Sequence, residues 1–388
     1  MNVLFVIHQY LDPNAGASGA TIKLGKEYQK LGHEVNYYSY DNLPENLPDI
    51  LKFLTFPLWV ARFLWFQNSK KKIDVVDAST RDLWFWAKWL SKLQADVPLS
   101  VTRSHGLEHI SHLQKKADEA RGDMSLSWKY GLYRGSIHLW EVTQSLHYSD
   151  LICLLNSEEY KYVVEVLGIS SDKVHTVANG IPDYLLHLPF KPTIEADTTI
   201  RIAQVSTFIP RKGIKFSIPA LNNILSRYPN VEMSFLGTAC KECTSAEQVY
   251  ANFDPLIRDR ITVIPRFDHT QLPQLLKDCH IKLFPSLSEG FSLALIEAMA
   301  CGLAPITTAT SGQLDVISDC HDGLIIPLRD SRAIETALEK LICDPVELDR
   351  LRRNAYNKAQ KYSWQSIAKK TIALYKKALQ HKISLVNK

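Results

Sequence analysis

Hydrophobic segments of strand length alternate with segments of helical periodicity along the whole chain. In the first half, such apolar runs occur at residues 2–7, 34–39, 73–77, 99–103, 150–154 and 173–178. A second series occurs at residues 199–205, 231–236, 261–265, 281–285, 304–308 and 323–326. Strands buried on both faces have nearly continuous apolar sequences, and parallel strands need helical crossovers between them. The pattern therefore predicts an α/β protein with two doubly wound, Rossmann-like parallel sheets.

The two series of strands are separated by a polar, proline-containing stretch over residues 182–198. A chain of 388 residues is also too long for a single ordinary core. We therefore expect a first domain over residues 1–182 and a second domain over residues 183–363. Residues 364–388 predict an amphipathic helix after the second sheet, and we expect it to pack back on the first domain.

The composition indicates an ordinary globular protein. Hydrophobic residues make up 46% of the chain and charged residues 22%, and the net charge of +4 is too small to indicate nucleic-acid binding. The seven cysteines form an odd set without the spacing of a disulfide framework, which favours a reducing, cytoplasmic location. Residues 1–7 enter an apolar strand without a basic leader, so we expect no signal peptide.

One apolar segment, residues 53–66, leaves two interpretations open. Pro57 and Arg62 interrupt it, and no apolar run in the chain reaches the roughly 20 residues of a membrane span. The segment fits a core helix on the first sheet. Its aromatic residues, together with Lys70–Lys72, also fit a peripheral contact through residues 53–72 with the inner face of an anionic membrane.

A strand-to-helix turn near residue 290 carries the most specific pattern. Residues 281–285 predict a buried strand, and the apolar stretch that follows predicts a helix that ends at Gly302. Glu289 and Gly290 then lie in the turn, and Glu297 lies about two turns into the helix. Backbone N–H groups at a helix start attract phosphate, and a carboxylate on either side can accept hydrogen bonds from sugar hydroxyls. We interpret this turn as a nucleotide-sugar site.

A basic turn follows the first strand of the second series. Arg211 and Lys212 stand beside Gly213 at the carboxyl end of that strand. Two cations next to a glycine turn are suited to a diphosphate, although a solvated basic turn has the same composition.

The first half offers two candidate elements at the carboxyl ends of its strands. Gly16-Ala17-Ser18-Gly19 follows the first strand and precedes the first helix, where glycines let the backbone approach a ligand. A flexible turn without a ligand is the alternative, because the spacing of a dinucleotide fingerprint is absent. His105 closes the fourth strand and is either a ligand-facing or a structural histidine.

Neither histidine nor cysteine spacing predicts a metal site. His109 and His112 follow His105 at helical spacing, but no carboxylate or cysteine group accompanies them. Cys240 and Cys243 form the only paired cysteine spacing, and no second pair follows at zinc-site distance. We expect no metal and no bound cofactor.

Taken together, these motifs resemble the retaining glycosyltransferases of family four (glycosyl transferases group 1), which have the GT-B fold. The resemblance is most specific in the Glu289-to-Glu297 frame and the following Ala298-Met299-Ala300-Cys301-Gly302. It also includes Arg211-Lys212-Gly213, Asn179-Gly180-Ile181, the early glycine loop, His105-Gly106 and Tyr362-Ser363-Trp364. The resemblance implies two Rossmann-like domains facing each other across a cleft, with a C-terminal helix that crosses back to the first.

The resemblance assigns the donor-binding residues of the second domain. Glu297 would accept hydrogen bonds from the ribose hydroxyls, and Glu289 would face the donor sugar. Backbone N–H groups around Gly290, Phe291 and Ser292 would approach the phosphate and the sugar.

It also assigns catalytic groups, with two departures. Lys212 matches the lysine that neutralises the diphosphate, and His105 matches the histidine near the reacting sugar. The family often has an arginine where this chain has Thr207, and Arg211 is the available substitute. The loop over residues 16–19 matches one near phosphate and acceptor, but lacks the adjacent glycine pair.

The resemblance implies a transferase that moves a hexose-type sugar from a nucleoside diphosphate sugar to a glycan or lipid-linked acceptor, as in polysaccharide biosynthesis, with retention of configuration. Cations and helix N–H groups would stabilise the negative charge that grows on the leaving diphosphate. Two alternatives stay open: a nucleotide-sugar epimerase of the same fold, and a catalytically silent sugar-nucleotide binding module.

Overall fold

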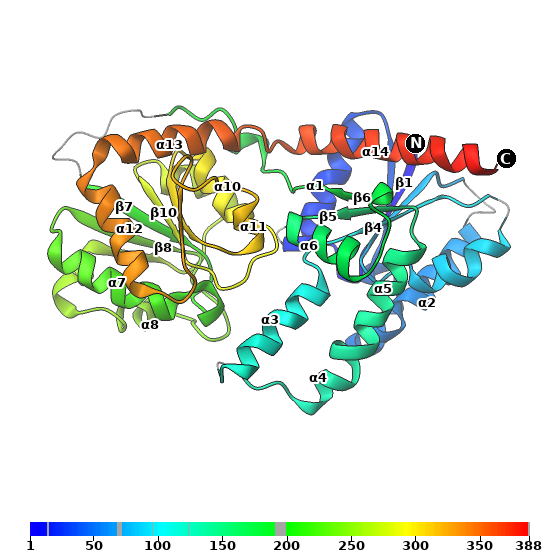
Figure 1. The fold of residues 1–388 in the computed structure, drawn as a ribbon, viewed down its shortest axis with the longest axis horizontal. Helices are drawn as coiled ribbons and strands as arrows, with labels where there is room; N and C mark the ends of the chain where they lie inside the picture. Colours follow the sequence, from blue (N-terminus) through cyan, green and yellow to red (C-terminus); the bar gives the residue numbers. More distant parts are fainter. Residues whose placement is uncertain (14, 68–71, 95, 123, 191–198, 387–388) are drawn as a thin grey trace. The chain divides into compact units, whose positions relative to one another are not determined.

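The computed structural model describes residues 1–13, 15–67, 72–94, 96–122, 124–190 and 199–386 (Figure 1). The chain forms two compact units. Unit 1 consists of Met1–Gly180 together with the C-terminal segment from Trp364, and unit 2 consists of Ile181–Ser363. Each unit contains one six-stranded parallel sheet, which confirms the predicted α/β class with two doubly wound sheets.

The sheet of unit 1 has the strand order β2-β1-β3-β4-β5-β6. All neighbouring strands are parallel, and Val3 of β1 lies opposite both Val35 of β2 and Val75 of β3. The strands are β1 (Asn2–Val6), β2 (Glu34–Tyr38), β3 (Val75–Ser79), β4 (Leu99–Arg103), β5 (Leu151–Leu154) and β6 (Val174–Thr176). The order reverses between β1 and β3, so the carboxyl ends of these strands form the switch point at which open α/β sheets bind ligands.

Two helices distant in sequence cover one face of this sheet, α1 (Gly16–Lys30) and α14 (Trp364–Val386). Tyr28 of α1 and Tyr375 of α14 are fully buried, and their hydroxyls lie 3.2 Å apart. The Tyr375 hydroxyl also donates to Asp77, whose carboxylate pairs with Arg103 at 2.7 Å. A buried ion pair that keeps all its partners avoids the cost of an uncompensated charge, so α14 is an integral part of unit 1.

The chain leaves unit 1 at a glycine. A Cβ on Gly180 would lie 2.7 Å from the backbone of Trp364, the first residue of α14, so only glycine fits at this crossing. The next residue, Ile181, donates its N–H to the carbonyl of Tyr362 at 2.7 Å within unit 2. Leu185, in the first part of the predicted linker, is fully buried in unit 2. Residues 191–198 of that linker lie outside the described residues.

The other face of the unit 1 sheet is covered by α2 (Asp49–Gln67), η2 (Trp86–Leu90) and α5 (His138–Tyr148). One side of α2 buries Phe56, Val60 and Leu64 against the strands, as the core-helix interpretation of this segment expects. The opposite side of α2 is exposed. Of the lysines at 70–72, Lys70 and Lys71 lie outside the described residues.

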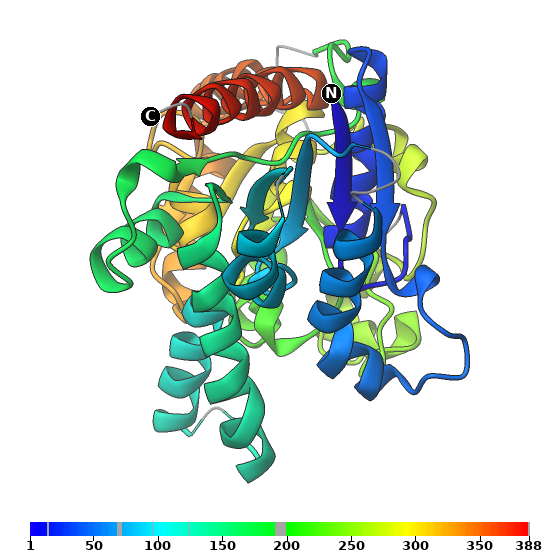
Figure 2. The same ribbon diagram turned by 90° about the vertical axis from the view of Figure 1, so that its right-hand side faces the viewer.

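Three helices extend away from the sheet of unit 1 (Figure 1). They are α3 (Glu108–Ala120), α4 (Trp128–Leu132) and η4 (Tyr133–Ile137), which together with the start of α5 form a protruding arm. In Figure 2, α14 lies at the top of unit 1, and α2 and the arm lie on the opposite side of the sheet.

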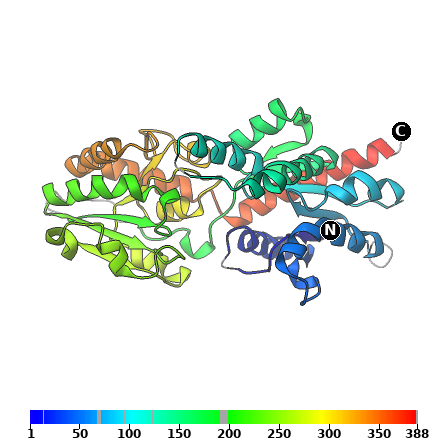
Figure 3. The same cartoon turned by 90° about the horizontal axis from the view of Figure 1, so that it is seen from below.

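The sheet of unit 2 has the strand order β12-β11-β10-β7-β8-β9. Helices cover both of its faces (Figure 3). The strands are β7 (Ile200–Val205), β8 (Val231–Leu236), β9 (Ile261–Ile264), β10 (Ile281–Phe284), β11 (Ala304–Thr308) and β12 (Leu324–Ile326). The longer helices of unit 2 are α7 (Ile214–Arg227), α10 (Leu293–Ala300), α12 (Ser331–Cys343) and α13 (Pro345–Ala359). The short helices of the two units are α6 (Ser157–Lys161), α8 (Ala246–Tyr250), α9 (Leu272–Leu276) and α11 (Ser311–Leu314).

Candidate functional site

The predicted strand-to-helix turn is present in unit 2. It runs from the end of β10 at Phe284 to the start of α10, where the Ser292 hydroxyl accepts a hydrogen bond from the N–H of Leu295 at 3.3 Å. Gly302 follows α10 with a φ of 84°, as a C-terminal cap requires. Glu289 and Gly290 lie in the turn, and Glu297 lies on α10 with 4% of its surface exposed.

The carboxylate of Glu289 gathers three partners at this turn. The Lys212 ammonium forms an ion pair with its Oε1, and the Ser286 hydroxyl donates to the same oxygen at 2.6 Å. Arg211 approaches it to 3.7 Å. Glu289 and Lys212 are 77 positions apart, and they meet because β10 pairs directly with β7. The structure thus brings together the acidic turn and the basic turn that the sequence showed separately.

The basic turn η8 (Pro210–Lys212) is held rigidly against the acidic turn. The carbonyl of Arg211 accepts a hydrogen bond from the N–H of Leu287 at 2.9 Å, and the Arg211 guanidinium donates to the carbonyl of Ser288 at 3.1 Å. Gly213 has a φ of 76°, and a Cβ there would lie 1.9 Å from the carbonyl oxygen of Pro285. Glycine is therefore required for the two turns to approach each other this closely.

A second lysine, which sequence reasoning did not select, lies beneath this cluster. Lys282 of β10 is fully buried, and its ammonium donates to the carbonyl of Val205 at 3.3 Å. Burial, together with repulsion from Lys212, lowers the pKa of Lys282 to about 7. The sequence could have indicated this buried lysine, because Lys282 stands within an otherwise apolar predicted strand.

Glu297 also has partners that the sequence did not reveal. His269 lies with its Nε2 3.2 Å from a carboxylate oxygen of Glu297, and its Nδ1 lies 2.6 Å from the hydroxyl of Tyr184. A neutral imidazole that donates from Nε2 and accepts at Nδ1 satisfies both contacts. Burial, reinforced by the Glu297 carboxylate, raises the pKa of Tyr184 to about 12, so the tyrosine remains a hydrogen-bond donor. Neither His269 nor Tyr184 belongs to a recognisable motif.

In unit 1, His105 follows β4, as expected. Burial lowers its pKa to about 3, and the charges of Arg103 and His8 contribute. The imidazole is therefore neutral at physiological pH and can exchange hydrogen bonds with a neutral ligand.

The glycine loop differs from its predicted form. Residues 16–19 do not precede the first helix but form its first turn. The Ser18 hydroxyl accepts a hydrogen bond from the N–H of Asp12 at 2.7 Å, and a Cβ on Gly19 would lie 2.5 Å from the carbonyl oxygen of Pro13. The two small residues thus allow the preceding loop to fold back against the helix start.

The remaining candidates for metal or thiol chemistry have ordinary partners. His109 bonds with Thr143 at 3.0 Å, and His112 bonds with Tyr130 at 3.1 Å. Within the described ranges, no three His, Cys, Asp or Glu side chains are grouped so that they could hold a metal ion. All seven cysteines, including Cys240 and Cys243, are free thiols.

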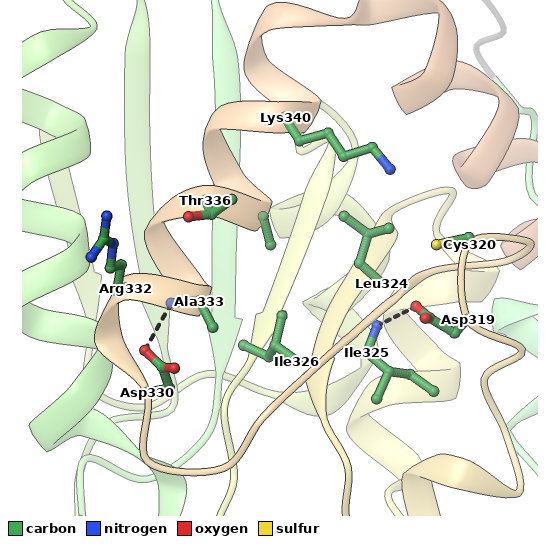
Figure 4. A pocket seen from close by; sticks show the side chains of 11 residues that line it. Asp319, Cys320, Leu324, Ile325, Ile326, Asp330, Arg332, Ala333, Thr336 and Lys340 are labelled. Atoms are coloured by element: carbon green, nitrogen blue, oxygen red, sulfur yellow. Dashed lines mark hydrogen bonds between the residues drawn. The ribbon is translucent and has the colours of Figure 1, made fainter.

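A separate pocket of about 470 Å³ lies at the β12 edge of the unit 2 sheet (Figure 4). It is formed by the edge strand β12 and the first turns of α12, and apolar side chains such as Leu324 and Ile326 line it. The carboxylates of its two aspartates already accept backbone hydrogen bonds. Asp330 accepts from the N–H of Ala333, and Asp319 accepts from the N–H of Ile325. This pocket contains none of the predicted donor-binding residues.

Comparison with known proteins identifies the class. Residues 15–183 match the family model "Glycosyltransferase Family 4", and residues 190–361 match the model "Glycosyl transferases group 1". Together these matches cover most of the chain, which belongs to the group 1 glycosyltransferases.

Individual relatives agree with this class. A phosphatidylinositol N-acetylglucosaminyltransferase polypeptide of Arabidopsis thaliana is 31% identical over 254 residues, which are 63% of this chain and 54% of that protein. The chain thus spans little more than half the length of this relative. Among solved structures, the sucrose-phosphate synthase of Thermosynechococcus elongatus has a TM-score of 0.75 at 20% identity, covering 98% of this chain and 100% of that one. Anabaena Alr3699/HepE in complex with UDP-glucose has a TM-score of 0.65 at 16% identity, covering 99% and 100%. At these identities the likeness establishes the GT-B fold.

Proposed function

We propose that this protein transfers a hexose-type sugar, with retention of configuration, from a nucleoside diphosphate sugar to a glycan or lipid-linked acceptor. The observation that carries the proposal is the cluster of Lys212, Arg211 and Glu289 at the start of α10. It combines two cations and a helix N-terminus for a diphosphate with a carboxylate for a sugar.

The cationic part of the cluster supports the chemical step. As the bond between sugar and diphosphate breaks, negative charge grows on the leaving group. Lys212 is only 15% exposed and is oriented by Glu289 before any ligand binds, so little reorganisation is needed when the charge develops. Arg211 is 53% exposed and contributes less, because water screens its charge.

The two carboxylates of the frame have separate tasks in the proposal. Lys212, Arg211 and Ser286 all approach the Oε1 atom of the Glu289 side chain, and in the proposal Oε2 accepts a hydrogen bond from a sugar hydroxyl. Glu297 would accept hydrogen bonds from the ribose hydroxyls, with His269 holding its carboxylate in place. Backbone N–H groups around Gly290, Phe291 and Ser292 would approach the phosphate.

The finer parts of the proposal rest on the family. Retention is proposed because the motifs resemble those of retaining enzymes, and attack on the face that the diphosphate leaves would preserve the anomeric configuration. UDP-glucose in the Anabaena neighbour supports a nucleoside diphosphate hexose as donor. The name of the plant relative supports a lipid-linked acceptor. The free cysteines support a reducing, cytoplasmic location. We invoke no metal and no cofactor besides the donor.

A donor panel tests the proposal. The protein is incubated with labelled nucleotide sugars, with and without glycan and lipid-linked acceptors, in the presence and absence of EDTA. Acceptor-dependent release of the nucleoside diphosphate, with a product of unchanged anomeric configuration by NMR, is the expected result. An epimerised sugar formed without acceptor would establish the epimerase instead. Donor binding in calorimetry without turnover on any acceptor would establish a silent binding module. An inverted product would contradict retention.

A further inference from the structure

One outer surface of unit 1 is unusually apolar. It is formed by three segments, α2, the stretch from η2 through η3 (Ser91–Leu93), and the stretch from α4 through α5. Trp128 is 74% and Leu93 71% exposed, and other large apolar side chains along the three segments are exposed with them. Among the described residues of unit 2, the exposed large apolar side chains are only Tyr184, Leu256, Leu314 and Val346. We call the exposed surface of these three segments the aromatic–basic face.

The exposed residues belong to the solvent side of amphipathic helices. On α2, Leu54, Leu58 and Trp65 recur at helical spacing opposite the buried Phe56 and Val60. Their exposure is therefore a property of the folded layer. Patches of this kind on a soluble domain mark interaction surfaces, because water tolerates large contiguous apolar areas poorly.

The same segments carry charge of almost one sign. Arg62, Lys92, Lys129 and Arg134 are exposed on them. Their only acidic residues are Asp49, at the first position of α2, and Glu141, which is buried and accepts a hydrogen bond from Tyr133. Cations without compensating carboxylates favour an anionic partner.

The aromatic and basic side chains are interleaved. Lys88 lies 5.3 Å from the ring centroid of Trp89 and 5.1 Å from that of Trp140. Lys92 lies 5.4 Å from the ring of Tyr148. Indole and phenol rings next to lysines are the combination that proteins place at the boundary between lipid headgroups and acyl chains.

We propose that the aromatic–basic face docks unit 1 on the surface of an anionic lipid bilayer, with its three segments in the headgroup region. The structure contains no span, since no helix in the described part of the chain is long and apolar enough to cross a bilayer. Docking would therefore be peripheral and reversible, and it would weaken with salt. The inference does not depend on the proposed reaction, because binding to lipid needs neither donor nor acceptor.

Sedimentation with vesicles tests the proposal. The full-length protein is mixed with vesicles of phosphatidylcholine alone or with phosphatidylglycerol added, at low and high salt. We expect binding to the anionic vesicles at low salt. The triple variant Lys92→Gln, Lys129→Gln, Arg134→Gln should bind about a hundredfold more weakly, since each cation near an anionic surface contributes roughly fivefold.

Matched variants separate specific docking from general charge. The triple variant Lys215→Gln, Lys241→Gln, Lys277→Gln removes three exposed lysines of unit 2 and should bind like the wild type. Leu93→Gln with Trp128→Gln changes only exposed apolar residues and should also weaken binding, whereas Leu256→Gln with Val346→Gln in unit 2 should not.

Three results would overturn the proposal. The first is that the wild-type protein stays in the supernatant with every vesicle. The second is that the two triple variants, in unit 1 and in unit 2, lose vesicle binding to the same extent. The third is that the protein binds no vesicles but self-associates in analytical ultracentrifugation, and that the Leu93 and Trp128 changes abolish this self-association. The last would assign the face to a second copy of the chain. Nucleotide binding, measured on the same variants by calorimetry, should be unchanged in all of them, so a failure here is distinct from a failure of the proposed reaction.

Discussion

Replacing Lys212 by alanine should lower turnover far more than it weakens donor binding. In the folded protein the Lys212 ammonium pairs with Glu289 and is only 15% exposed. Its charge is needed most when the diphosphate leaves, so the interaction is stronger in the transition state than in the ground state. Loss of one preorganised group of this kind costs on the order of 10²–10³ in turnover, or about 3–4 kcal/mol.

The neighbouring arginine should not compensate for this loss. Arg211 lies 3.7 Å from Glu289, but it is 53% exposed. Ion pairs in such positions contribute about 0–1 kcal/mol, because solvent screens them. Arg211→Ala should therefore lower turnover by no more than about tenfold, and the double variant should resemble Lys212→Ala.

The assay is steady-state release of the nucleoside diphosphate with the best donor, combined with calorimetric titration of the free nucleotide. Lys215→Ala, an exposed lysine of α7, is the matched control and should behave like the wild type. Lys212→Ala also leaves Glu289 without its main partner, so the melting temperature of each variant must be compared. Wild-type turnover in a folded Lys212→Ala variant would refute the phosphate site, and an equal loss for Arg211→Ala would show that the arginine is the principal cation.

Three further changes test the other named groups. Glu297→Ala should weaken nucleotide binding in calorimetry while the melting temperature stays within a few degrees, because the carboxylate that would bind the ribose is lost; unchanged affinity would contradict the assignment. His105→Ala should reduce turnover with little change in nucleotide affinity, and a large drop in melting temperature instead would favour a structural histidine. Lys282→Met should stabilise unit 2. The folded-state pKa of Lys282 is about 7, below the ordinary 10.5. Between these pH values the unfolded chain therefore binds more protons than the folded chain, so stability rises with pH. Below pH 7 the folded protein bears the full free-energy cost of burying the charged amine. The gain in the free energy of unfolding should be about 5 kcal/mol at pH 6 and should vanish above about pH 10.5. The exposed Lys277→Met should show no such profile, and denaturant titrations across this range measure both.

Local patterns predicted the elements well. Strands such as β7 and β10 lie where the predominantly apolar runs predicted them, because a strand covered by helices on both faces is mostly apolar. The turn that holds Glu289 and the helix that holds Glu297 were also predictable, since glycine and the following apolar run act within a few residues. The exception was the start of α1, where Gly16–Gly19 form helix and not loop.

Contacts between distant segments could not be predicted in this way. The pair of Lys212 and Glu289 requires β10 to lie beside β7, and strand order depends on how the crossovers pack and not on local sequence. The same holds for His269 beside Glu297, which joins the loop after β9 to α10. Histidines in polar loops carry no pattern that would single this one out.

The sequence by itself determined the α/β class, the two series of strands and the motifs that identify the glycosyltransferase family, because periodicity and glycine placement are properties of neighbouring residues. Only the tertiary structure decided which side chains meet and which remain exposed. Tyr28 and Tyr375, 347 positions apart, share one buried network because α1 and α14 pack together. Phe56 and Phe66 are both phenylalanines of α2, yet one is fully buried and the other 59% exposed. Burial depends on what packs against a helix face, and that is settled only when the whole layer is assembled.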